Sequence, residues 1–340
     1  MTSVKEFRVS REPTADSLGR GSFLFTDHYS VFDWGKMPDT IPEKGQSLCT
    51  MGAFNFELLE SEGIPTHYRG VVVDEEVQPL VSALDMGTPP AEMAIALTTV
   101  PDLPFVDGDY DYAAYMAATH EHYLIPLEIV FRNTVPVGSS LRRRVSPAEV
   151  GLTVSEWPDE TVSLPEPVIE FSTKFERQDR YLTRDEAQRI AGKPALSELE
   201  SVARDVNRVI TEQAEQAGFT HHDGKIECLW SGTEVRVADV AGTFDENRFS
   251  VDGQQLSKEV LRQYHKRTQP EWVEAVAAAK KQATADGVAD WRARCERSPK
   301  PLPREVIETA RNLYCAGTNA YLDREVFDAP LLSVVLERLC

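Results

Sequence analysis

Strand-like and helix-like segments follow one another in a definite order along this chain instead of alternating. Short apolar runs at residues 23–25 and 71–73 predict strands, and helical apolar spacing over 48–60 predicts a helix between them. Another apolar run, 125–131, predicts a buried strand that leads into Arg132. The first part of the chain is therefore expected to be rich in β-structure.

Helical signals dominate the later part of the chain. Thr183 and Glu186 have the spacing of a capping box, and apolar residues recur at helical spacing over 196–217. Two strands are predicted next, over 225–230 and 234–240, and the remainder is mostly helical. This order predicts an α+β fold with two lobes, and the cleft between the lobes is the expected place for a ligand.

The two lobes are expected to meet in the apolar run that precedes Arg132. We assign residues 1–130 to a β-rich N-terminal lobe and residues 131–340 to a mixed lobe that ends in helices. Residues 86–120 are expected to be an insertion in the first lobe, because prolines interrupt this segment and aspartates make part of it acidic.

The chain carries a strong net negative charge. Its 340 residues include 55 acidic and 36 basic ones, which gives a formal charge of −19. Such a field repels phosphates of nucleic acids and anionic membrane surfaces, so neither is an expected partner. No stretch is apolar enough to span a bilayer, and the N-terminus lacks the apolar segment of a secretory signal. We therefore expect a cytoplasmic protein, and a homo-oligomer stays open.

Arginine outnumbers lysine by 25 to 11 among the basic residues. Together with the acidic excess, this bias indicates adaptation to high salt, and an ordinary acidic cytosolic enzyme is the alternative. The five cysteines are scattered without a C-x-x-C spacing. This favours small buried thiols over a disulfide framework or a structural zinc site.

Lys225, Glu227 and Asp239 form the first candidate site. Lys225 and Glu227 are two residues apart on a predicted strand, so their side chains share one face of it. A three-residue loop over 231–233 would place Asp239 opposite Lys225 and bring the three charges together, as a Mg²⁺–triphosphate site requires. A two-residue loop would shift the register by one and turn Asp239 away. A solvated hairpin face is the alternative to a site.

A group of arginines forms the second candidate site. Arg132 follows the buried strand, and a turn that contains Gly138 and Ser139 precedes three consecutive arginines at 142–144. Guanidinium groups beside amides and hydroxyls suit phosphate and carboxylate ligands. Because such a group is unusual in a chain of charge −19, we expect it to bind anions, and a basic surface loop is the alternative.

Segments of this chain resemble, in order, the motifs of the SAICAR synthetase family. In the first half these segments are Phe25-Thr-Asp27 to Asp33, Ile41-Pro-Glu-Lys-Gly45, Phe56-Glu-Leu-Leu-Glu60, Gly63-Ile-Pro-Thr-His67 and Ile125 to Asn133 with Gly138-Ser139. In the second half they are Ser172-Thr-Lys174, Lys225-Ile-Glu227, Asp239 to Phe249 and Leu302 to Thr309. The likeness covers nearly the whole chain apart from 86–120. The chain is identified as a member of this family, of an archaeal or halophile-like kind.

The resemblance implies an ATP-dependent ligase of purine biosynthesis that uses Mg²⁺. In the family's reaction, carboxyaminoimidazole ribotide, L-aspartate and ATP give SAICAR, ADP and phosphate. The γ-phosphoryl group of ATP activates the ribotide carboxylate as an acyl phosphate, and the aspartate amine then displaces phosphate. The implied fold has two lobes with a nucleotide cleft between them, as in kinase-like or ATP-grasp-like proteins.

The resemblance also implies roles for matched residues. Glu227 and Asp239 would bind Mg²⁺ and, with Lys225, form the catalytic group. Lys5 and Lys225 would contact the phosphates of ATP, and the segment around Glu128 would offer backbone groups to adenine. The residues implied for the ribotide and aspartate are Asp33, Arg132, Ser139, Lys174 and Arg248.

The chain departs from the family pattern near the expected phosphate site. Only Lys5 remains of a Gly-Lys-x-Lys loop, and Val240 stands where the family has a glutamate. A catalytically inert homologue that serves as a binding or scaffold protein is therefore one alternative function. A related ligase with another acceptor or amine is the second alternative, and the matches at the substrate-side residues disfavour it.

Overall fold

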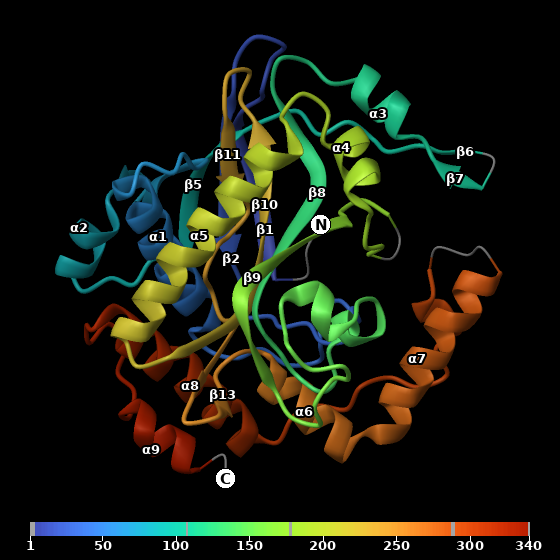
Figure 1. Ribbon diagram of the computed structural model, residues 1–340. Helices are drawn as coiled ribbons and strands as arrows, with labels where there is room; N and C mark the ends of the chain where they lie inside the picture. Colours follow the sequence, from blue (N-terminus) through green and yellow to red (C-terminus); the bar gives the residue numbers. More distant parts are fainter. Residues whose placement is uncertain (1–3, 107, 177–178, 287–289, 339–340) are drawn as a thin grey trace.

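The computed structural model describes residues 4–106, 108–176, 179–286 and 290–338. Its strands form an N-terminal sheet, a central sheet and a small hairpin, and helices pack around the sheets (Figure 1). Every strand pairing in these sheets is antiparallel, which confirms the predicted α+β class. Within the described ranges, no helix is both long and apolar enough to cross a membrane.

The N-terminal sheet has the strand order β1-β2-β5-β3-β4. These strands span, in that order, Lys5–Arg11, Gly19–Phe25, Glu92–Leu97, Tyr68–Val73 and Glu76–Gln78. Strand β5 lies inside the segment 86–120 and pairs with both β2 and β3. The segment 86–120 therefore cannot be an insertion over its whole length, because the buried apolar run of β5 belongs to the sheet.

The central sheet has the strand order β13-β12-β10-β8-β9, and β11 also pairs with β10. These strands span, in the order of the chain, Tyr123–Val135 (β8), Val162–Thr173 (β9), Thr220–Trp230 (β10), Val235–Ala238 (β11), Asn247–Val251 (β12) and Gln254–Gln255 (β13). The two sheets are joined at the residues before β3: the His67 amide donates to the Val237 carbonyl of β11, and the Ala96 amide of β5 donates to the His67 carbonyl.

The helices follow the predicted periodicity. The expected helices over 48–60 and 196–217 are confirmed as α1 and α5, and the predicted capping box of Thr183 and Glu186 begins α4. Their bounds are Lys44–Ser61 (α1), Leu80–Asp85 (α2), Tyr112–Ala117 (α3), Arg184–Ala191 (α4), Leu196–Gln216 (α5), Glu259–Thr268 (α6), Pro270–Ala285 (α7), Arg304–Leu322 (α8) and Leu332–Glu337 (α9).

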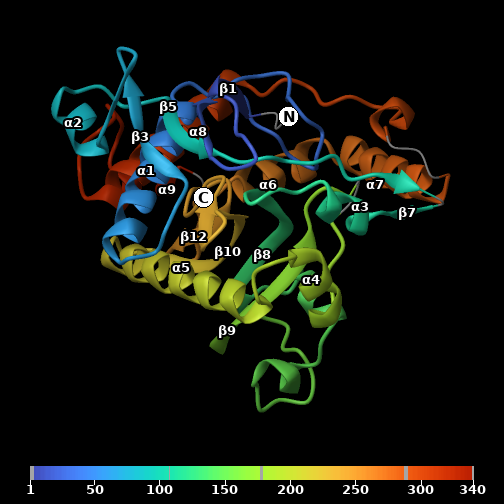
Figure 2. The same ribbon diagram turned by 90° about the horizontal axis from the view of Figure 1, so that it is seen from above.

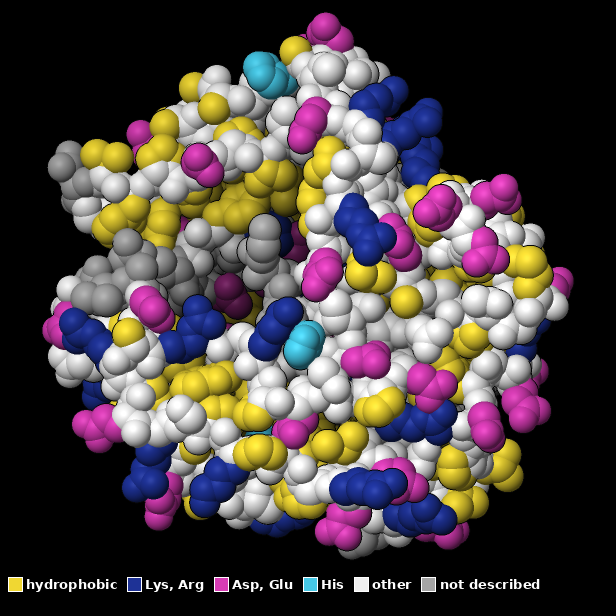
Figure 3. Space-filling model, turned by 180° about the vertical axis from the view of Figure 1, so that it is seen from behind, with side chains coloured by type: hydrophobic (Ala, Val, Ile, Leu, Met, Phe, Trp, Pro, Cys, Tyr) yellow, Lys and Arg dark blue, Asp and Glu magenta, His cyan; other side chains and the backbone are white. Residues whose placement is uncertain are grey.

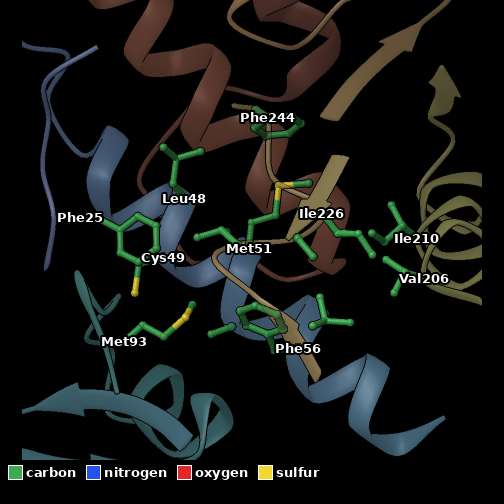
Figure 4. Close-up of a cluster of buried hydrophobic side chains, with 14 of the residues drawn as sticks. Phe25, Leu48, Cys49, Met51, Phe56, Met93, Val206, Ile210, Ile226 and Phe244 are labelled. Atoms are coloured by element: carbon green, nitrogen blue, oxygen red, sulfur yellow. The ribbon is translucent and has the colours of Figure 1, made fainter. Parts of the chain in front are cut away.

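Helix α1 packs against the N-terminal sheet, α5 and α8, and its side chains join the cores of the two sheets. Leu48, Met51 and Phe56 of α1 point into a cluster with Met93 of the N-terminal sheet and Ile226 of the central sheet (Figure 4). One apolar core therefore serves both sheets. Strand β8 also runs across residue 130, so the division into lobes at 130 and 131 stays a prediction.

The chain between β5 and β8 forms an arm that leaves the body of the molecule. The arm contains a small hairpin, Phe105–Val106 (β6) with Asp109–Tyr110 (β7), followed by α3. In Figures 1 and 2 this hairpin projects on the same side as α7. The gap between the two lies on the left in Figure 3, where the surface is hollowed and acidic and basic side chains lie at the bottom.

Candidate active site

The β10–β11 hairpin brings two carboxylates together in an unexpected way. Trp230 pairs with Val235, and Ser231 donates its amide to the Glu234 carbonyl, so the loop is the two-residue Gly232-Thr233 turn. The three-residue loop that would place Asp239 opposite Lys225 is therefore wrong. Glu227 pairs with Ala238, and Asp239 follows the end of β11 with a φ of 59°.

Asp239 nevertheless reaches Glu227, because the left-handed backbone changes the direction of the chain after the last pair of the ladder. The His67 side chain holds this turn, with its Nε2 atom 3.0 Å from the Asp239 carbonyl oxygen. Burial raises the pKa of Glu227 to about 7, and the nearby charge of Asp239 contributes to this increase. The prediction that Asp239 and Glu227 share one site is thus supported by a geometry that the strand pairing alone does not give.

Each of these two carboxylates has its own lysine. The Nζ of Lys5, whose side chain is only 6% exposed, pairs with Asp239, and the Nζ of Lys174 pairs with Glu227. Burial acts to raise the pKa of Asp239, but the charges of Lys5 and Lys174 outweigh it, and the pKa lies below its usual value. Lys5 is the first residue of β1, so this strand of the N-terminal sheet contributes to the site.

Lys225 lies on the same strand face as Glu227 but has different partners. Its Nζ is 2.6 Å from Oε1 of Glu128 and 3.6 Å from Oε2 of Glu246. Burial acts to lower the pKa of Lys225, yet these carboxylates hold it well above its usual value. Asp179, which sequence reasoning missed, lies near the same charges: burial and the charge of Glu128 raise its pKa. We call Lys5, Lys174, Lys225, Glu227 and Asp239 the lysine–carboxylate group.

Glu128 occupies a central position in the sheet. It pairs with Ser172 of β9 and with Glu227 of β10. Next to it the ladder is irregular, because the register between β8 and β10 shifts between Glu227 and Leu229. The resemblance to the family assigns the backbone groups of β8 at this irregularity to adenine, and that assignment stays a prediction.

A second group of charges lies further along β8 and β10. The buried Arg132 donates from Nε to Oε2 of Glu170 at 2.7 Å and from a terminal nitrogen to Oδ2 of Asp223 at 3.4 Å. Arg248 holds the same aspartate, with Nε 2.7 Å from Oδ1 of Asp223. Arg144 pairs with Glu170, so the structure brings Arg132, Arg144 and Arg248 together. We call these three arginines with Glu170 and Asp223 the arginine group.

Tyr181 completes this surface. Its hydroxyl accepts from Arg132 at 2.9 Å, and the guanidinium carbon of Arg144 lies 3.6 Å from the centre of its ring. A stacked guanidinium keeps free edges for an anionic ligand. Of the predicted arginine cluster, Arg132 and Arg144 thus lie together, whereas Arg142 donates to the backbone carbonyls of Val135, Pro158 and Glu160.

The remaining predicted residues lie at the edges of this region. Ser139 is buried, and its hydroxyl accepts from the Leu141 amide at 3.3 Å at the start of a short 3-10 helix, Ser140–Arg143. Asp33 is 84% exposed at its side chain and pairs with Lys280 of α7, and its charge contributes to the raised pKa of Asp179. The structure places neither Ser139 nor Asp33 in direct contact with the arginine group among its described hydrogen bonds.

One missed residue could have been found from the sequence. Asp223 precedes Lys225 by two positions, so strand periodicity puts it on the face that carries Lys225 and Glu227. Glu170 and Tyr181 gave no such signal, because Glu170 reaches the site through the pairing of β9 with β8 and Tyr181 through a bridge to Ser172 of β9.

The donor atoms of the lysine–carboxylate group fit a magnesium ion. Among the described residues there is no group of three or more side chains of the His, Cys, Asp and Glu types placed to hold a metal ion. Mg²⁺ needs only one or two carboxylates, since water and phosphate oxygens supply its other ligands. Glu227 and Asp239 are such a pair, and a divalent cation would relieve the repulsion that contributes to the raised pKa of Glu227.

Comparisons with known proteins agree with this geometry. The SAICAR synthetase family model matches residues 14–279. The chain is 40% identical over 347 aligned positions to a putative phosphoribosylaminoimidazole-succinocarboxamide synthase of Archaeoglobus fulgidus, covering 100% of this chain and 98% of that protein. It is 30% identical over 260 positions to the phosphoribosylaminoimidazole-succinocarboxamide synthase of Thermoplasma acidophilum, covering 72% of this chain and 78% of that protein.

Solved structures show the same fold. A SAICAR synthase from Saccharomyces cerevisiae complexed with SAICAR superposes with a TM-score of 0.60 at 18% identity, covering 96% of this chain and 94% of that one. A SAICAR synthetase in complex with ADP gives a TM-score of 0.54 at 21% identity, covering 88% of this chain and 99% of that one.

The family model and the curated relatives thus place the chain among the ATP-dependent ligases. The chain belongs to the SAICAR synthetase family. Its activity is the ligation of aspartate in purine biosynthesis, as the sequence motifs predicted.

Proposed function

We propose that the two groups of charges divide the substrates of this ligase between them. The lysine–carboxylate group receives the triphosphate of ATP with Mg²⁺, and the arginine group receives the anionic ribotide and aspartate. One observation carries this proposal: Glu227, Lys225 and Asp223 lie at alternate positions on one face of β10. Glu227 and Lys225 belong to the lysine–carboxylate group, whereas Asp223 binds the arginines of the arginine group. A single strand therefore runs from the nucleotide to the carboxylate that it activates.

Lys5 and Lys225 act on the phosphates. Each now lies against a carboxylate, Asp239 and Glu128 respectively, and each ammonium group has three donors that can be shared with phosphate oxygens. Glu227 and Asp239 would hold Mg²⁺, which neutralises charge on the transferring phosphoryl group when bound. The β8 segment near Glu128 offers backbone groups to adenine.

Arg132 and Arg248 bind the anionic substrates, to which Ser139 is also assigned. Arg132 is held by Glu170 and Asp223, so its guanidinium group is fixed before the ligand arrives. Asp33 and Lys174 are assigned to the same substrates, and Lys174 also pairs with Glu227 of the lysine–carboxylate group. Lys174 would therefore act in both halves of the reaction.

The chemistry needs charge neutralisation more than proton transfer. A ribotide carboxylate oxygen attacks the γ-phosphorus and ADP leaves. The neutral aspartate amine then attacks the acyl carbon, and phosphate leaves with the proton that the nitrogen loses. Both steps bring anionic groups together, and the lysines and arginines of the site reduce the repulsion between them. A cytoplasmic location and a homo-oligomer also stay predictions.

The proposal is tested by measuring ADP release while each substrate is omitted in turn. We expect ADP formation to need the ribotide and Mg²⁺ together, because the ribotide carboxylate is the phosphoryl acceptor. Rapid ATP hydrolysis with aspartate alone would contradict carboxylate activation. No ADP release under any combination would favour the inert homologue.

A further inference from the structure

The segment that carries Lys174 and Asp179 is closed at its base. The Thr173 amide donates to the Arg180 carbonyl at 3.0 Å, and the Arg180 amide donates to the Thr173 hydroxyl at 3.1 Å. Lys174 and Asp179 lie between these two anchors. Both belong to the charged region of the proposed site, since Lys174 pairs with Glu227 and the charge of Lys225 acts on Asp179.

Glu176 links this segment to itself. Its carboxylate accepts from Arg180 at both oxygens, with Oε1 3.0 Å and Oε2 3.3 Å from guanidinium nitrogens. Arg180 continues to Glu186 in the first turn of α4. Glu176 therefore ties Arg180, at the end of the segment, to the position two residues after Lys174.

The arm between β5 and β8 reaches Glu176 from the other side. Tyr112, the first residue of α3, donates its hydroxyl to Oε1 of Glu176 at 3.0 Å. Tyr115 is fully buried one turn later, where its hydroxyl donates to the Leu124 carbonyl of β8 at 2.8 Å and its ring lies 5.8 Å from that of Phe175. Helix α3 is thus fixed to β8 by Tyr115 and to the segment 173–180 by Tyr112.

We propose that Tyr112 is a positioning residue for the reaction: through Glu176 it holds Lys174 and Asp179 in place over the nucleotide. This inference deepens the proposed function and rests on it. A hydrogen bond to a carboxylate is one of the stronger polar contacts in a protein, and a displacement of about 1 Å in a reacting site reduces the rate by up to about 10²-fold. The arm that carries this tyrosine lies in the segment to which the sequence assigned no role.

The test compares two variants that lose the same kind of bond. Tyr112→Phe removes the hydroxyl and keeps the ring. Tyr68→Phe is the matched control, because the Tyr68 hydroxyl donates to Oε1 of Glu57 at 2.9 Å in the N-terminal sheet, away from the segment 173–180. We expect Tyr112→Phe to lower kcat on the order of tenfold at an unchanged melting temperature relative to the control, with little change in the Kd of ADP.

Hydrogen exchange supplies a readout that is independent of activity. The amides of residues 173–176 and 179–181 are expected to exchange faster in Tyr112→Phe and to keep their rate in Tyr68→Phe. Unchanged exchange and unchanged kcat in Tyr112→Phe would overturn the inference, as would an equal fall of kcat in both variants. Faster exchange in a protein that forms no ADP with the ribotide would instead overturn the proposed function and leave the positioning contact standing.

Discussion

Glu227 and Asp239 lie close enough to interact electrostatically, yet their pKa values shift in opposite directions. Burial and the charge of Asp239 raise the pKa of Glu227, whereas Lys5 and Lys174 keep the pKa of Asp239 below its usual value in spite of burial. Asp239 therefore stays ionised at neutral pH as the fixed negative charge of the pair. A cation that enters the site would meet this charge first.

Replacing Asp239 by asparagine tests this assignment. The amide keeps the shape of the side chain but removes the charge that pairs with the buried Lys5, so we expect Asp239→Asn to fold with reduced stability and still to bind the ribotide. Loss of a charged metal ligand costs several kcal/mol of transition-state stabilisation, which lowers kcat by about 10²-fold or more. Circular dichroism, ribotide affinity and initial rates at saturating Mg²⁺ measure the three quantities.

Arg248→Ala is the matched variant in the other group. Arg248 binds Asp223 and is assigned to the anionic substrates, so its loss is expected to weaken ribotide binding while ATP still binds. Calorimetric affinities for ADP and the ribotide on both variants distinguish the two assignments. Normal turnover by Asp239→Asn would remove the metal role of Asp239 and of Glu227 with it.

The site shows where sequence reasoning succeeded and where it failed. Strand periodicity correctly places Lys225 and Glu227 on one face, and it could have added Asp223. The hairpin register could not be derived, because residues 231–234 are compatible with both a two-residue and a three-residue loop. The positive φ of Asp239 could not be predicted from the sequence pattern either. With this φ, Asp239 lies near Glu227 even though the true strand register would turn it away.

The fold shows the same division between local and long-range information. Helix α5 was predictable because its apolar residues recur at helical spacing and face one core. Strand β5 was missed because prolines flank its apolar run, and only its pairing with β2 and β3 identifies it as a sheet strand. Glu170 was missed for a similar reason, since the long connection before β9 leaves its register open.

Arg132 is predicted to be important for stability as well as for binding. Its side chain is buried between Glu170 and Asp223, so Arg132→Met leaves carboxylates without part of their counter-charge. We expect the free energy of unfolding to fall by about 3 kcal/mol, as is usual when one partner of a buried ion pair is removed. Denaturant unfolding monitored by fluorescence measures the change.

The exposed pair of Arg8 with Glu92 provides the control for this measurement. Arg8 is mostly solvent-exposed, and ion pairs of this kind contribute little to stability. Arg8→Met is therefore expected to unfold at nearly the wild-type denaturant concentration. If Arg132→Met did the same, the arginine group would have to be more hydrated than its burial indicates.

His221 is predicted to make the protein less stable in acid. Burial lowers the pKa of His221 to about 4. Its Nε2 atom is 2.9 Å from the amide nitrogen of Asn247, whose oxygen accepts from the Gly242 amide, so Nε2 must accept and cannot be protonated without losing this bond. Between about pH 6.5 and 4 the unfolded chain binds the extra proton, and the free energy of unfolding falls as pH falls.

The size of this effect follows from the shift. A difference of roughly two and a half pKa units corresponds to about 3 kcal/mol at full expression. His221→Asn, which has no proton to gain, is expected to show a shallower decrease in stability across this range. His120→Asn, at an exposed position of the arm, serves as control and is expected to keep the wild-type slope. Equal slopes in all three proteins would exclude His221 as the cause.

Salt is predicted to stabilise the protein and to support its activity. The 55 acidic side chains repel one another in a chain of charge −19, and this repulsion is screened as the Debye length falls to about 3 Å at 1 M salt. We expect the melting temperature to rise by about 5 °C between dilute buffer and 1 M KCl, which corresponds to roughly 3.5 kcal/mol for a chain of this size. Sucrose stabilises proteins by exclusion from their surface without screening charge, so it separates the two causes. If KCl and NaCl raise the melting temperature and sucrose at equal osmolality does not, charge repulsion is the cause. Full stability and activity in dilute buffer would contradict salt adaptation and leave the ligase function unaffected.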